Sequence, residues 1–286
     1  MTEGFVRARD APDDVQILWG ITAGFDAAGM RFMADNWAAG CLAEYARAPL
    51  ENCHPLDERR LCGPPSEGGL GYKVEELLQL PVMAAAMGGL RALDLKAGER
   101  IIVAPATGAF SGAAVQIAVA LGARVVAVGR SQAKLEKVQQ VFPAGRVEIV
   151  QTTGDVKADT AALKRFGPVD AYFDMSPAEA KGSSHLRSCF LALRKYGRAC
   201  MMGVVHQDLA VPYPVLTLNS LVVKGLFMYE REDIRLLIKM VEAGILNIGK
   251  EGGNEVVGKF KLEESDEAFA LASKTREMGK LVAFVL

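Results

Sequence analysis

The stretch APATGAFSGAAVQIAVALG, residues 104–122, decides the fold. It joins a short apolar run to a helical pattern, which is the setting of a phosphate-binding loop at the start of a helix. Dinucleotide-binding loops have glycine at three positions, because the chain must turn tightly, approach the pyrophosphate and pack helix on strand. Here these positions hold Ala106, Gly108 and Ser111. Only the middle glycine is present, so an ordinary strand–turn–helix junction is the alternative interpretation.

Short apolar runs alternate with helical patterns from Gly98 onward. Continuous apolar runs are typical of strands buried on both faces of a parallel sheet. The alternation predicts an α/β fold with a doubly wound, six-stranded parallel sheet. The expected strands are 100–104, 124–128, 146–150, 169–173, 197–203 and 221–227, and the expected helices include 111–121 and 233–245.

The two ends of the chain lack this alternation. Residues 40–50 alternate like a strand, and the last 30 residues contain strand-like runs at 254–262 and 280–286 around a short helix. We therefore expect a Rossmann nucleotide-binding domain inserted between two pieces of a second domain. The expected boundaries are 81–246 for the nucleotide-binding domain and 1–80 with 247–286 for the second domain.

The end of the second expected strand indicates which nicotinamide cofactor would bind. An NAD-binding chain places an acidic residue there for the ribose hydroxyls. In this chain Gly129 stands at that point, and Arg130, Ser131 and Lys134 follow. No carboxylate would repel a 2′-phosphate, and a guanidinium is present to pair with one, so we expect NADP(H). The expected cofactor-binding residues of these two loops are Thr107, Gly108, Ala109, Phe110, Ser111, Gly129, Arg130, Ser131 and Lys134.

Residues 95–131, LKAGERIIVAPATGAFSGAAVQIAVALGARVVAVGRS, resemble the nucleotide-binding segment of the medium-chain dehydrogenase/reductase superfamily. The sequence is similar to zinc-type alcohol dehydrogenases and to quinone oxidoreductases. The resemblance continues through LPVMAAAMGGLRAL (80–93) and GRACMMGVV (197–205). It implies that residues 40–58 end a GroES-like catalytic β domain, of which this chain would lack the N-terminal part.

The resemblance also bears on metal binding. In zinc-type members, a cysteine ligand occupies the position that Ala84 holds here, and the missing N-terminal part supplies the other ligands. The remaining candidates, Cys41, Cys53, His54 and Cys62, are too widely spaced for a typical zinc site. We therefore expect no metal.

For members without zinc, the resemblance implies hydride transfer between NADPH and an activated alkene, quinone or carbonyl. The substrate would be small and apolar, with secondary metabolites as one candidate class. The resemblance places the nicotinamide near Gly203, Val204, Val205 and Phe227. His206 and Tyr229 are the candidate proton donors in the adjoining loops.

Two alternative functions remain open from the sequence. One is a non-redox protein on the same scaffold, acting as a binding module, a pseudoenzyme or a catalyst of rearrangement. The other is a truncated zinc-type alcohol dehydrogenase, against which Ala84 argues. Substrate-dependent oxidation of NADPH would distinguish a reductase from a non-redox protein.

Composition narrows the partners and the compartment. The chain has 286 residues, a net charge of −1 and a pI of about 6.4, which argues against binding to nucleic acid or to an anionic membrane. Its five cysteines include no C-x-x-C pair, and reduced thiols fit a cytoplasmic protein. Strand 221–227 is apolar on both faces and is expected at the sheet edge, where it could pair in a homodimer.

Overall fold

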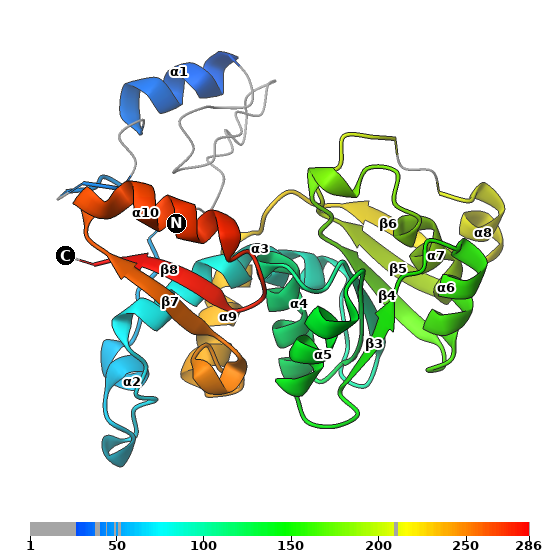
Figure 1. Cartoon of the computed structure of the whole chain (residues 1–286), viewed down its shortest axis with the longest axis horizontal. Coiled ribbons are helices and arrows are strands. Elements are labelled where there is room, and N and C mark those ends of the chain that lie inside the picture. Colours follow the sequence, from blue (N-terminus) through cyan, green and yellow to red (C-terminus); the bar gives the residue numbers. More distant parts are fainter. Residues whose placement is uncertain are drawn as a thin grey trace.

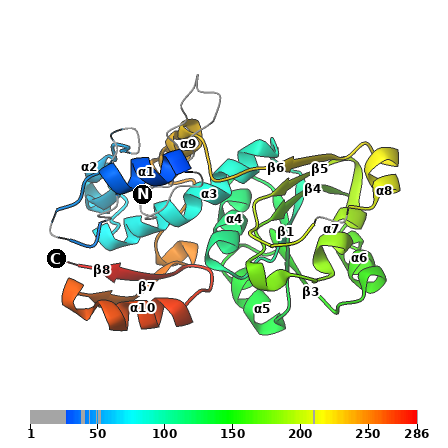
Figure 2. The same ribbon diagram turned by 90° about the horizontal axis from the view of Figure 1, so that it is seen from above.

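The computed structural model describes residues 27–37, 41–43, 45–48, 50, 53–208 and 211–285. Figures 1 and 2 show two lobes, one formed around a large sheet and the other around a strand pair and its helix. The strands are β1 (Arg100–Ala104), β2 (Arg124–Gly129), β3 (Val147–Gln151), β4 (Val169–Asp174), β5 (Leu193–Met201), β6 (Val222–Gly225), β7 (Glu255–Phe260) and β8 (Lys280–Phe284). The α-helices are α1 (Ala27–Asn36), α2 (Glu58–Cys62), α3 (Gln79–Ala92), α4 (Ala109–Ala120), α5 (Gln132–Gln140), α6 (Val156–Lys164), α7 (His185–Ala192), α8 (Tyr213–Leu218), α9 (Arg231–Glu242) and α10 (Ser265–Lys274).

The large sheet confirms the predicted fold class. Its six strands are all parallel and lie in the order β3-β2-β1-β4-β5-β6. The order reverses between β1 and β4, and this is the place where ligands bind in doubly wound folds. Strand β6 lies at one edge, as its sequence led us to expect.

Successive side chains of β1 point to opposite faces of the sheet, and each face is covered by helices. Ile101 and Val103 pack into a core with α3, α4 and α9, whereas Ile102 and Ala104 pack into a second core with α7. All four side chains are fully buried. A strand segment buried on both faces must be apolar, and residues 101–104, IIVA, form such a run.

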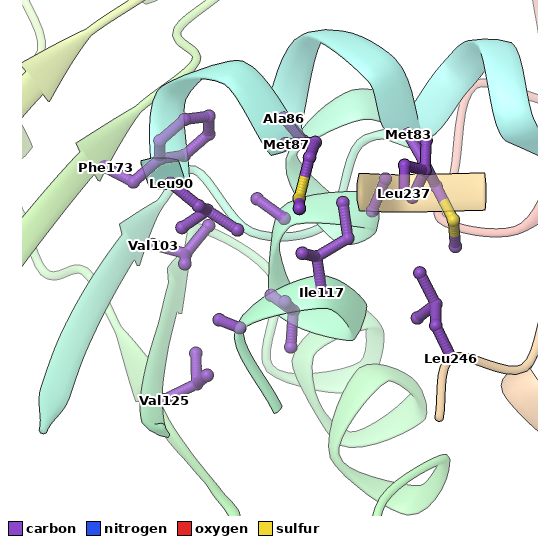
Figure 3. Packing of buried hydrophobic residues seen from close by; sticks show 14 of the residues in the cluster. Met83, Ala86, Met87, Leu90, Val103, Ile117, Val125, Phe173, Leu237 and Leu246 are labelled. Atoms are coloured by element: carbon purple, nitrogen blue, oxygen red, sulfur yellow. The ribbon is translucent and has the colours of Figure 1, made fainter. Parts of the chain in front are cut away.

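Two adjacent glycines bring α3 close to the sheet. A Cβ atom at Gly89 would overlap the ring of Phe173 on β4, and one at Gly88 would lie 2.6 Å from the carbonyl oxygen of Met228. Figure 3 shows the side chains of Met87 and Leu90 on α3 pointing toward the side of α4 that carries Ile117. Phe173 lies at one end of the same cluster. Helix α3 therefore packs closely on the sheet and on α4.

In the second lobe, β7 and β8 form a parallel pair with α10 as the crossover between them. Both views show α10 lying along this pair. Lys259 of β7 pairs with Glu75, so the residues before and after the large sheet meet here. The strand-like runs near the C-terminus were thus predicted correctly, while the partial GroES-like domain and its boundaries stay predictions.

The prediction of a strand over residues 40–50 was wrong for the residues that the structure describes there. Positions 41–43 and 45–48 form bends and irregular chain. Leu42, Tyr45 and Leu50 are 49%, 90% and 81% exposed, so the alternating apolar side chains have no buried face to cover. Alternation alone predicts a strand only where a partner strand and a core are available.

Candidate functional site

A cavity of about 970 Å³ opens at the carboxyl ends of the large sheet's strands. It lies where the strand order reverses, and its volume falls within the range of small-molecule sites. Its walls come from the loops after β1, β2 and β4, together with Thr152 and Arg276. The lining includes Thr107, Gly108, Ala109, Phe110, Ser111, Gly129, Arg130, Ser131 and Lys134, all of which were predicted to bind the cofactor.

The loop after β1 turns without any residue in a left-handed conformation. Gly108, the N-cap of α4, has φ −83°, which other residues adopt readily. The backbone N–H of Gly108 donates to Oγ of Ser111 at 3.2 Å, and Ser111 is 3% exposed. Ser111 therefore stabilises the turn itself, and this explains how the loop forms with one glycine instead of three.

The segment 276–278 packs directly on this loop. The N–H of Ala109 donates to the carbonyl of Arg276 at 3.0 Å, and the N–H of Met278 donates to the carbonyl of Thr107 at 3.1 Å. Gly112 is needed for this approach, because a Cβ atom there would overlap the side chain of Met278. This contact takes up the N–H of Ala109. The N–H groups of Phe110 and Ser111, which follow it in the first turn of α4, have no acceptor within the helix.

The loop after β2 carries exposed basic side chains. Arg130 and Lys134 are both exposed at the cavity wall, and Oγ of Ser131 caps α5 by accepting from the N–H of Lys134 at 3.4 Å. Gly129 is buried, and a Cβ atom there would meet only ordinary contacts with Leu135 and Thr107. This end of the cavity thus offers positive charge and hydrogen-bond donors to an anion.

On the other side of the cavity, buried polar groups follow β4. Oδ1 of Asp174 accepts from the hydroxyls of Tyr172 at 3.0 Å and Ser176 at 2.6 Å. Oγ of Ser176 lies 2.9 Å from Nε2 of His185, and Nδ1 of His185 lies 2.7 Å from Oγ of Ser183. Asp174, Ser176 and His185 are at most 6% exposed. His185 and Ser183 line the cavity.

The predicted residues of the loops after β5 and β6 are outside the cavity lining. Val204 is 61% exposed and Phe227 is 42% exposed, and Val205 and His206 lie in the same loop after β5 as Val204. Gly203 abuts the β4 side, because a Cβ atom there would lie 2.6 Å from Oδ2 of Asp174. Tyr229 is 3% exposed and packs against Gly88 in the core.

The structure also brings to the cavity residues that sequence reasoning missed. Met175 and Pro177 directly follow β4, so the rule that ligands bind beyond strand ends could have indicated them. His185 begins a helix, and Arg276 comes from the C-terminal segment; no local pattern marks either one. The other missed residues are Ala104, Pro105, Val128, Thr152, Glu179, Ala180, Lys181, Gly182 and Ser183.

Within the described part of the chain, no three His, Cys, Asp or Glu side chains are grouped so as to hold a metal ion. Ala84 is fully buried in α3, and no disulfide joins any of the cysteines. None of the described helices is long and apolar enough to cross a bilayer.

Comparison with known proteins agrees with this architecture. Residues 111–243 match the sequence model of the family described as zinc-binding dehydrogenase. Over 259 residues the chain is 23% identical to "Probable D-xylulose reductase A" of Aspergillus clavatus, covering 90% of this chain and 66% of the relative. These matches support the resemblance to the medium-chain dehydrogenase/reductase superfamily.

Two further proteins are similar to this chain. The chain is 25% identical to the "NAD-dependent alcohol dehydrogenase" of Sulfurisphaera tokodaii, with 68% of this chain and 52% of that protein aligned. The quinone oxidoreductase of Thermus thermophilus, described with its NADPH complex, superposes with a TM-score of 0.55 at 23% identity. That match covers 76% of this chain and 68% of the other. The chain spans between about half and two thirds of the length of these two curated relatives.

Proposed function

We propose that this protein is an NADP(H)-dependent oxidoreductase that works without zinc on a small apolar alkene, quinone or carbonyl compound. The observation that carries the proposal is the cavity at the strand-order reversal, with Arg130, Ser131 and Lys134 on its wall. The similarity to a quinone oxidoreductase described with NADPH supports this cofactor. The similarity to an NAD-dependent alcohol dehydrogenase supports a nicotinamide cofactor but does not favour NADP(H) over NAD(H).

The donors around the cavity fit a phosphorylated dinucleotide. The N–H groups of Phe110 and Ser111 and the guanidinium of Arg276 would hold the pyrophosphate. Arg130 and Lys134 would hold a 2′-phosphate, since charge-assisted hydrogen bonds to phosphate are among the strongest available. When bound, the cofactor supplies or accepts the hydride, and the protein orients it and limits the access of water.

Ala84 is the reason to propose a reaction that does not depend on zinc. The superfamily's zinc-type members use a cysteine at this position, and a buried methyl group cannot coordinate a metal. Electron-poor alkenes and quinones need less activation than simple carbonyls do. We therefore rank them first among the substrates.

His206 and Tyr229 remain the proposed proton donors. The exposed side chain of His206 supports a role in contacting substrate. Burial of Tyr229 against Gly88 would require the loop after β6 to move before its hydroxyl could reach a ligand. Of the two, His206 is the better candidate.

A second candidate function is nucleotide binding without redox turnover. The positions of the two proposed proton donors favour it, because neither His206 nor Tyr229 is part of the cavity lining. Such a protein would bind NADPH and leave it unoxidised.

One experiment separates the two functions. Purified protein is titrated with NADPH by fluorescence, and NADPH absorbance is then followed with a panel of quinones, enones and aldehydes. Saturable binding with substrate-dependent oxidation supports the oxidoreductase, and binding without oxidation of any panel member supports the second function. The absence of binding to NADPH and to NADH would contradict both.

A further inference from the structure

A continuous chain of hydrogen bonds runs from the sheet to the cavity. It consists of Asp174, Ser176, His185 and Ser183, which we call the Asp174 relay. The successive contacts measure 2.6, 2.9 and 2.7 Å. The first three residues are buried, whereas Ser183 is exposed at the cavity wall. The cofactor chemistry proposed above gives the inner part of this chain no role.

The direction of each hydrogen bond follows from the buried carboxylate. Burial raises the pKa of the Tyr172 hydroxyl well above its ordinary value, and Cys189 and Asp174 raise this pKa further. Tyr172 therefore keeps its proton and donates it to Asp174. A carboxylate only accepts hydrogen bonds, so the hydroxyl of Ser176 also donates to Asp174.

The tautomer of His185 is then determined. Ser176 has used its only proton, so its oxygen can only accept from the imidazole at Nε2. A neutral imidazole with a proton on Nε2 has a bare Nδ1, which accepts from the hydroxyl of Ser183. Ser183 has now also used its proton, and its oxygen presents only lone pairs to the cavity.

We propose that the Asp174 relay makes Ser183 a specificity-determining hydrogen-bond acceptor in the cavity. Ser183 would recognise a ligand group that carries a proton, namely a ribose hydroxyl or an exocyclic amine of a nucleotide. It would disfavour phosphate oxygens, which also only accept hydrogen bonds. The identity of the ligand rests on the proposed function, whereas the tautomer of His185 does not.

The relay gives the cavity two chemically different sides. Arg130 and Lys134 after β2 offer donors and positive charge, which suit phosphate. Ser183 after β4 offers an acceptor. A dinucleotide bound the other way round would place phosphate oxygens against Ser183 and leave polar groups unpaired. Because unpaired polar groups at a binding site are costly, the two sides together fix the orientation of the dinucleotide. Asp174, Ser176 and His185 act in this as positioning residues.

The first test needs no ligand. The chain has three histidines, so ¹⁵N-histidine NMR gives few signals, and His185→Gln assigns the one of interest. We expect the proton of His185 on Nε2 at neutral pH. A wild-type ring protonated on Nδ1, or on both nitrogens, would overturn the relay.

The second test measures binding of the nucleotide. Ser183→Ala should weaken NADPH roughly two- to tenfold, as expected for the loss of one neutral hydrogen bond. Ser184→Ala is the matched control, because Ser184 is half-buried beside Ser183 but is not part of the cavity lining. Equal affinity of wild-type protein and Ser183→Ala for NADPH would overturn the assignment of Ser183.

Two ligand analogues identify the source of the donor. With the hypoxanthine analogue of NADPH, which lacks the exocyclic amine of adenine, the penalty of Ser183→Ala should vanish if that amine is the donor. A penalty that persists with the analogue assigns the donor to a ribose hydroxyl. If wild-type protein binds no nucleotide, the proposed function fails, and the tautomer measurement still decides the relay.

Discussion

The carboxylate of Glu277 lies 2.9 Å from the ammonium group of Lys134 at the edge of the cavity, and the backbone of Glu277 forms an antiparallel bridge with Gly108. The hydrogen bond from Lys134 holds the pKa of Glu277 below its ordinary value, so this carboxylate is charged at neutral pH. The carboxylate of Glu277 thus already pairs with Lys134, a residue that the proposed function assigns to binding phosphate.

Replacing Glu277 by glutamine should therefore strengthen NADPH binding. The pair is partly exposed, and pairs of this kind contribute about 0.2–1 kcal/mol, so we expect an increase in affinity of up to about fivefold. The gain should shrink as salt is added, because surface charges are screened. Fluorescence titration of NADPH at two salt concentrations measures both effects.

The matched control for this variant is Glu255→Gln. Glu255 also pairs with a lysine, Lys280, but it lies on β7 and is not part of the cavity lining. It should leave the affinity for NADPH unchanged. A weaker affinity in Glu277→Gln would show that Lys134 needs its partner to be held in place for binding.

Arg130→Ala should weaken NADPH binding about tenfold or more, since a hydrogen bond to a charged group contributes about 1.5–3 kcal/mol. Binding of NADH, which lacks the 2′-phosphate, should be nearly unchanged. Arg124→Ala is the control, because Arg124 is exposed at the opposite end of the same strand. Parallel losses for both cofactors in Arg130→Ala would mean that the residue is structural.

The parts of the fold that the sequence predicted well are those with a local physical cause. After a first arginine, strands β1 and β2 are apolar because helices cover both faces of the sheet, and this pattern is visible without a structure. The start of β5 was missed, because the charged Arg194 and Lys195 follow its first residue and Tyr196 adopts a positive φ of 60°. Its predicted start was the next residue, Gly197.

The candidate site divides in the same way. Two groups of site residues were predicted because each group follows one strand and begins one helix. The first is Thr107 to Ser111, and the second is Gly129, Arg130, Ser131 and Lys134. His185 and Arg276 could not be predicted, since tertiary packing alone brings them to the cavity. No local sequence pattern predicts the hydrogen bond between Ala109 and Arg276, because these residues are far apart in the sequence.

Gly203→Ala should destabilise the protein through a contact with the end of β4. The new methyl group would lie 2.6 Å from Oδ2 of Asp174 and 2.7 Å from the carbonyl oxygen of Ser176, which are far inside contact distance. Overpacking of this kind costs about 1–3 kcal/mol, and the melting temperature should fall by several degrees. Calorimetry or circular dichroism measures the shift.

Gly225→Ala is the matched control for that variant. Gly225 ends β6, and a Cβ atom there meets nothing within 4 Å. Its melting temperature should stay close to that of the wild-type protein. If both variants melt alike, the packing of Gly203 on Asp174 is not as tight as described.

The exposed edge of the large sheet should pair in a homodimer. Strand β6 is the edge strand, Val222 on it is 57% exposed, and nearby Leu218 is 77% exposed. An edge with exposed apolar side chains favours pairing with a second strand. Light scattering should give a dimer, and Val222→Asp should shift it toward monomer. Ile245→Asp, at a site 59% exposed outside this edge, should leave the dimer intact; a monomeric wild-type protein would contradict the proposal.

Purified protein should contain no zinc, and its redox activity should survive chelation. Catalytic zinc polarises a carbonyl or alcohol oxygen and needs three protein ligands with an open position. Ala84 is fully buried at the position of one such ligand, and the described residues offer no alternative group of ligands. Metal analysis by mass spectrometry, with NADPH oxidation assayed before and after EDTA, measures both properties. About one zinc per chain, with activity lost to the chelator and restored by zinc, would show that the site is built from other residues.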